Sequence, residues 1–195
     1  MSSNCKQCYF LTLLFMLIFM ILYILFLTSQ TATFPTFQVN SAIINSLTLN
    51  NTKLTTNLNI ALSVTNQAPD IINFDNISVD VFYMDPYLIL NTSSLPSFTT
   101  DFMRVIEMNL SVNQVVVSGA ANGINQSLHQ YGMVQFGLDL SALIKFTNNI
   151  FHPGWMYLNV VCYPLRFAFS SNANVSNITT GISLESLTCY KSNDI

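Results

Sequence analysis

Apolar and polar residues alternate along several segments of this 195-residue chain. A period of two is typical of a strand with one face in a core and the other in water. It predicts strands over residues 57–65, 76–83, 108–112, 134–141, 158–162 and 165–169, with a shift of phase between the last two. The first and fourth of these strands predict a shared core of Leu58, Ile60, Leu62, Val64, Val134, Phe136, Leu138 and Leu140, with Asn59, Ser63, Gln135 and Asp139 facing water.

The number and spacing of these strands predict the fold class. Several half-buried strands, separated by Pro and Gly, are typical of an antiparallel β-sandwich, here of about seven strands. One segment departs from the pattern, because Ile124, Leu128 and Tyr131 recur at i, i+4 and i+7. That spacing predicts one short helix, ended by Gly132.

The N-terminal part of the chain has a different pattern, an unbroken apolar run. Residues 9–27 contain no charge, Gly or Pro, and only Thr12 interrupts them. A helix of this length spans about 28 Å, close to the roughly 30 Å of a bilayer core. The run predicts a single transmembrane signal-anchor helix over residues 9–28. The other segments are then a tail (1–8), a linker (29–36) and one exterior domain (37–191).

The charges around the run predict its orientation. Lys6 precedes the run, and the next basic residue is Lys53. Because positive charge stays cytoplasmic, we expect a cytoplasmic N-terminus and an exterior C-terminal domain. A cleavable signal peptide is the alternative. The length of the run and the poor small-x-small site after Leu27 favour the anchor.

Composition narrows the class of partner. Charged residues make up 8% of the chain, hydrophobic residues 51%, and the net charge is −3. Six scattered basic residues make no phosphate-tracking stripe, so we expect no nucleic-acid partner. Sugars could supply solubility, or the sequons could arise by chance in a chain rich in Asn and Ser. The candidate N-glycosylation sites are Asn50, Asn76, Asn91, Asn109, Asn125, Asn174 and Asn177.

The four cysteines form two pairs in the sequence. Cys5 and Cys8 flank the cytoplasmic end of the apolar run, where they are candidates for palmitoylation or free thiols. Cys162 and Cys189 lie in the exterior domain, where a disulfide could persist. Spacing alone leaves open whether these two meet.

No constellation of residues specifies a chemistry. His129 and His152 have no neighbouring metal ligands in the sequence. The acidic residues at 70, 75, 80 and 85 recur every five positions, which places successive ones on opposite faces of a strand. We therefore expect no catalytic residue, no cofactor and no metal, and a protein that is not an enzyme. An enzyme would require a cleft where acid, base and nucleophile converge.

Several motifs occur in an order that resembles a known family. They are Pro35-Thr36-Phe37-Gln38-Val39, a turn at Asn66, Leu95-Pro96-Ser97-Phe98, a strand from Tyr157 to Cys162, and Cys189 near the end. Over residues 1–190 this layout resembles the plant NDR/HIN-like proteins, which carry a late embryogenesis abundant group-two domain. The resemblance implies a sandwich of about seven strands plus a helix, a place in the plasma membrane and a role in defence or stress responses. It implies no catalytic residues.

Two functions follow as hypotheses. In the first, residues 9–28 anchor the chain in the lipid bilayer, and the exterior domain binds protein or cell-wall partners. In the second, the domain is a lipid-binding module with an apolar cleft between its sheets. A tightly filled core would argue against the second. The oligomeric state stays open.

Overall fold

The computed structural model describes residues 3–29, 33–50, 53–68, 70–84, 87–115, 118–147, 154–169 and 180–192. The chain separates into two compact units, Met1–Thr33 and Phe34–Ile195, which we describe one at a time.

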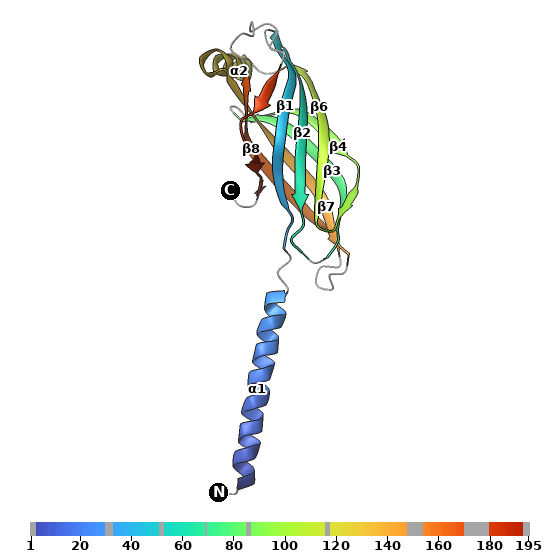
Figure 1. The fold of residues 1–195 in the computed structure, drawn as a ribbon, viewed down its shortest axis with the longest axis vertical. Helices are drawn as coiled ribbons and strands as arrows, with labels where there is room; N and C mark the ends of the chain where they lie inside the picture. Colours follow the sequence, from blue (N-terminus) through green and yellow to red (C-terminus); the bar gives the residue numbers. More distant parts are fainter. Residues whose placement is uncertain are drawn as a thin grey trace. The chain divides into compact units, whose positions relative to one another are not determined.

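The first unit contains one helix, α1, which runs from Ser3 to Ser29 (Figure 1). Its side chains are described for residues 9–24, and all of them are exposed. The predicted anchor segment is thus helical up to Ser29. Among the described residues, no helix is long and apolar enough to cross a membrane.

The second unit is an antiparallel sheet with one further helix. Its elements are β1 (Thr36–Asn50), β2 (Lys53–Thr65), β3 (Ile72–Met84), β4 (Tyr87–Leu95), β5 (Phe98–Thr100), β6 (Met103–Val115), α2 (Ser118–Tyr131), β7 (Met133–Phe146), β8 (Met156–Phe169), β9 (Gly181–Ser183), β10 (Leu187–Thr188) and β11 (Tyr190–Lys191). The main strand order is β4-β3-β7-β8-β9-β1-β2-β6, with β10 on β1, β11 on β8 and β5 on β3.

This sheet is nearly closed and barrel-like. In Figure 1, β1, β2 and β6 lie in front of β3 and β7. The end strands β4 and β6 meet where the Asn91 side chain donates a 2.9 Å hydrogen bond from Nδ2 to the carbonyl oxygen of Ser111. We call this contact between β4 and β6 the seam.

The architecture corrects the predicted two-sheet sandwich. The three residues of β9 pair with both β8 and β1, so one continuous sheet joins the two halves. Period-two alternation requires only one buried face, and a curled single sheet satisfies that as well as a sandwich does. Bulges in β1, β3 and β8 bend these strands and increase their twist, which favours curling.

The predicted core is confirmed at all eight positions in β2 and β7, each at most 3% exposed. Asn59 and Gln135 are exposed, as expected. Ser63 is buried instead, and its hydroxyl has two acceptors within hydrogen-bond distance, the carbonyl oxygen of Gln38 at 3.3 Å and Asn40 Oδ1 at 3.2 Å. Asp139 is half-buried, because Asp80 lies directly opposite on β3.

The two predicted C-terminal strands are one strand, β8. Its shift of phase matches a register irregularity, since Phe136 pairs with Leu165 but Leu138 pairs with Cys162. Gly137 lies between these pairs, beneath the ring of Phe82. A Cβ at this position would overlap that ring, which explains the glycine.

The predicted short helix is present as α2. It ends at Gly132, whose φ of 62° is in the left-handed region that favours glycine, and whose N–H donates to the Leu128 carbonyl at 3.0 Å. Ile124 and Leu128 are buried against the sheet. Tyr131, which was predicted to lie on the same face of the helix, is exposed instead.

Candidate functional site

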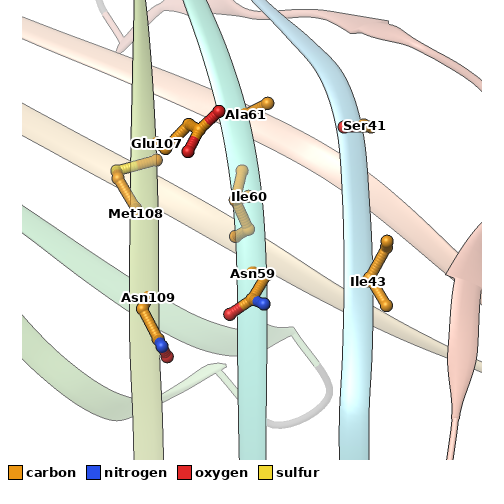
Figure 2. Close-up of a pocket in the computed structure, with 8 residues that line it drawn as sticks. All are labelled: Ser41, Ile43, Asn59, Ile60, Ala61, Glu107, Met108 and Asn109. Carbon is orange, nitrogen blue, oxygen red and sulfur yellow. The ribbon is translucent and has the colours of Figure 1, made fainter.

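An open depression lies on the outer face of β1, β2 and β6 (Figure 2). It has a volume of about 440 Å³. Two rows of paired residues cross the three strands and line it. One row is Ile43 on β1, Asn59 on β2 and Asn109 on β6. The other row, two residues away on each strand, is Ser41, Ala61 and Glu107. Its lining is completed by Ile60 and Met108.

The lining of this depression is suited to hydrogen bonding. Asn59 and Asn109 each offer an amide donor and a carbonyl acceptor, Ser41 offers a hydroxyl, and Glu107 is an acceptor with negative charge. Ile43 contributes apolar surface. Among the described lining residues Glu107 is the only titratable side chain. The lining therefore presents hydrogen-bond donors and acceptors, one negative charge and a small apolar area.

Large side chains are buried in the interior of the sheet. Phe136 lies against Phe167, with ring centroids 6.1 Å apart, and against Tyr83 at 6.4 Å. Phe37 and Phe74 make an edge-to-face pair at 6.2 Å. The described residues therefore carry no observation that favours the lipid-binding alternative, which needs an apolar cleft inside the fold.

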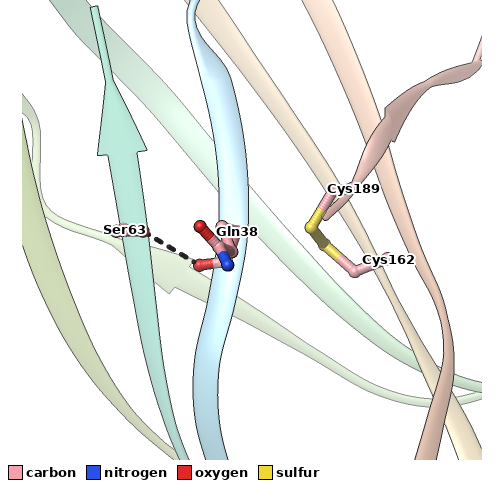
Figure 3. The surroundings of a disulfide bond; sticks show 4 residues. All are labelled: Gln38, Ser63, Cys162 and Cys189. Atoms are coloured by element: carbon pink, nitrogen blue, oxygen red, sulfur yellow. Dashed lines mark hydrogen bonds between the residues drawn. A yellow bond between two sulfur atoms is a disulfide. The ribbon is translucent and has the colours of Figure 1, made fainter. Parts of the chain in front are cut away.

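Cys162 and Cys189 are joined by a disulfide (Figure 3), with Cα atoms 4.3 Å apart. The N–H of Cys189 also donates to the carbonyl oxygen of Phe37 at 2.9 Å. The disulfide and this hydrogen bond together hold the C-terminal segment against β8 and β1. Cys5 and Cys8 lie on the backbone of α1, but their side chains are outside the described residues.

The candidate sequons differ in environment. Asn76, Asn109 and Asn125 are exposed; Asn76 sits at the β3 bulge with a φ of 48°, and Asn109 lines the depression. Asn91 is half-buried, and its Nδ2 donates to Ser93 Oγ as well as across the seam. The side chain of Asn50 and all of residues 174 and 177 lie outside the described part of the chain.

A pair of aspartates is the chemical feature that sequence reasoning missed. Asp80 and Asp139 are paired across β3 and β7, and each has a buried Oδ1 with no hydrogen-bond partner among the described residues. Burial, and secondly the charge of Asp80, raises the pKa of Asp139 above its ordinary 3.8. The missing signal is strand register, which brings the two residues together although they are far apart in the sequence.

The expectation that successive aspartates face opposite sides of a strand is wrong for β3. The bulge at Asn76 shifts the phase, so that Asp75 and Asp80 both face outward. Hydrogen bonds from Ser97 Oγ, at 2.5 Å, and from the Asn76 N–H lower the pKa of Asp75. Residue 85 is outside the described residues.

His129 does not contribute to a metal site among the described residues. His129 is exposed on α2, and residue 152 lies outside the described residues. In the part of the chain that the structure describes, no group of three or more His, Cys, Asp or Glu side chains could hold a metal ion.

The fold and the depression define a class: a nearly closed antiparallel sheet with a polar surface recess, preceded in the chain by an apolar helix. No protein-family model matches the chain, and no curated protein matches it. The resemblance to the NDR/HIN-like proteins rests on the motifs quoted above.

Proposed function

We propose that this chain is a single-pass membrane protein whose exterior domain binds a macromolecular partner without catalysis. The observation that carries the proposal is the surface of α1. Between residues 9 and 24, fifteen large apolar side chains are 45–72% exposed and point in every direction around the helix. A helix that is apolar all round needs apolar surroundings, either a protein core or lipid. Lys6 before the run orients the domain toward the exterior.

The depression on β1, β2 and β6 is the proposed contact surface. Its amides and its carboxylate suit the hydroxyl and amide groups of a polysaccharide or a polypeptide, because both are rich in donors and acceptors. The large side chains buried inside the sheet support a surface contact over an enclosed ligand. The resemblance to the NDR/HIN-like proteins supports a place in the plasma membrane and a role in plant defence or stress responses.

Site-specific photo-crosslinking tests the contact surface. A benzoylphenylalanine residue replaces Ser41, which is exposed in the depression, in the full chain expressed in plant cells. The matched control carries it at Ser94, which is exposed on β4. We expect a discrete adduct from position 41 and none from position 94. The substitution Glu107→Lys should weaken the adduct, because it reverses the charge of the surface.

Two outcomes would contradict the proposal. One is equal crosslinking from positions 41 and 94. The other is an adduct at position 41 that does not change when Glu107 is replaced.

A further inference from the structure

Strand pairing brings one set of strand ends together at the end of the sheet where the chain enters the domain. Thr36 opens β1 and pairs with Thr65, the last residue of β2, which pairs with Met103, the first residue of β6. Ile72 opens β3 and pairs with Phe146, the last residue of β7. We call this the linker end. In Figure 1 it is the lower end of the domain, and α2 lies at the other end.

Exposed apolar side chains gather around the linker end. The domain exposes eleven large hydrophobic side chains among its described residues, and six of them lie within two residues of a strand terminus at this end. We call these six the rim: Ile71, Phe102, Met103, Val105, Trp155 and Tyr157, each 42–70% exposed. The other five are dispersed over the rest of the domain: Ile43, Ile89, Tyr131, Ile182 and Leu184.

The backbone holds parts of the rim in place. The N–H of Asn66 donates to the carbonyl oxygen of Phe102 at 2.6 Å, and the N–H of Thr147 donates to that of Ile71 at 2.9 Å. The Asn66 side chain donates to the carbonyl oxygens of Asp70 and Asp101 at 2.6 and 3.1 Å. The apolar side chains are thus presented on braced turns, and their exposure costs hydrophobic free energy unless something covers them.

The described charges at the linker end nearly balance. Within two residues of these strand ends are two acids, Asp70 and Asp101, and two bases, Arg104 and Lys145. A third base, Lys191, reaches this end from β11, with its Nζ 3.8 Å from the ring centroid of Phe34. Arg104 is engaged, because its Nη1 donates to the Thr99 carbonyl at 3.2 Å and its guanidinium lies 5.1 Å from the Phe98 ring centroid. A surface that is apolar and has little net charge favours an apolar partner over a strongly acidic or basic one.

We infer that the rim docks on the apolar–polar interface of the lipid bilayer that holds α1, an inference that rests on the proposed function. From Ser29, the last residue of α1, to Thr36, the first of β1, the chain has seven peptide units, which reach at most about 25 Å. When α1 is embedded in lipid, the chain therefore tethers the first residue of β1 within about 25 Å of the end of that helix. Trp and Tyr are enriched at the apolar–polar interface of a bilayer, because their rings are apolar and each carries one polar group.

The single tryptophan of the chain, Trp155, provides a probe of the rim. The full chain is reconstituted into phosphatidylcholine vesicles, either unmodified or with brominated acyl chains, which quench a tryptophan only on contact. We expect Trp155 emission to fall in the brominated vesicles and acrylamide in the water to quench it poorly. Phe102→Ser together with Met103→Ser should reverse both effects.

A matched control places the probe at the other end of the domain. The double variant Trp155→Phe, Tyr131→Trp moves the only tryptophan to the end of α2, where the native tyrosine is 68% exposed. Its emission should be the same in brominated and unmodified vesicles and should be quenched readily by acrylamide.

The outcomes separate the inference from the proposed function. A chain that does not float with the vesicles in a density gradient defeats the anchor itself. A chain that floats while acrylamide, but not bromine, quenches Trp155 leaves the anchor intact and overturns the docking. If neither agent quenches Trp155, a second copy or another protein covers the rim, and the docking on lipid is equally overturned.

Discussion

Replacing Phe136 by alanine is the substitution whose cost follows most directly from the fold. Phe136 is fully buried on the inner face of β7, in contact with the rings of Phe167 and Tyr83. Truncating a buried phenylalanine removes its burial and leaves a cavity, at a cost of about 3–5 kcal/mol. A domain of this size has a total stability of about 5–15 kcal/mol, so the loss is a large fraction of it.

Urea denaturation of the full chain, followed by near-ultraviolet circular dichroism with the disulfide kept oxidised, measures this loss. With a slope of about 2 kcal/mol per molar urea, the midpoint should fall by roughly 1.5–2.5 M. The neighbouring substitution Gln135→Ala is the control, because this side chain is exposed on the opposite face. It should change stability by less than about 0.5 kcal/mol. Equal shifts for the two variants would refute the assignment of faces in β7.

Three further predictions follow from the same structure. Burial, and then the Asp80 carboxylate, raises the pKa of Asp139 in the folded chain above 3.8. The contribution of Asp139 to folding stability is therefore fully present below pH 3.8 and is lost as the pH rises through the pKa of the folded state. Asp139→Asn should therefore raise the urea midpoint at neutral pH and not in acid; an unchanged or lower midpoint at neutral pH would contradict this. The Cys162–Cys189 bond closes a span of 27 residues, so Cys189→Ser should cost about 3.5 kcal/mol in the same assay, and reduction of the native chain should cost as much. Asn91→Ala removes the hydrogen bond across the seam, which is worth about 1 kcal/mol. It should speed amide hydrogen exchange in β4 and β6 more than in β7 and β8. Equal acceleration in all four strands would argue against the seam.

The parts of the fold that a local pattern encodes could be predicted. Leu58 to Val64 and Val134 to Leu140 alternate because one face of each strand must leave water. The helix signal at Ile124 and Leu128 likewise depends only on neighbours along the chain. β1 has such a pattern only in pieces: register shifts after Val39 and after Ile44 break its period, so no strand was predicted over its length.

The features that depend on long-range pairing had no local signal. The choice between a sandwich and one curled sheet depends on β9, three residues that join β8 to β1. The depression requires three strands in register, and the Asp80–Asp139 pair requires the register of β3 on β7. The rim was not predicted, because its members come from three separate turns whose closeness depends on where the strands end.

The central claim, a membrane anchor followed by an exterior domain, is tested most directly by translating the full chain in the presence of microsomes. We expect a product that keeps its N-terminus, resists extraction by alkaline carbonate and gains mass that endoglycosidase removes, since Asn76 and Asn125 are exposed on the exterior domain and lie outside the depression. A product that carbonate releases, that shows no such gain in mass, or that begins after the apolar run would contradict it.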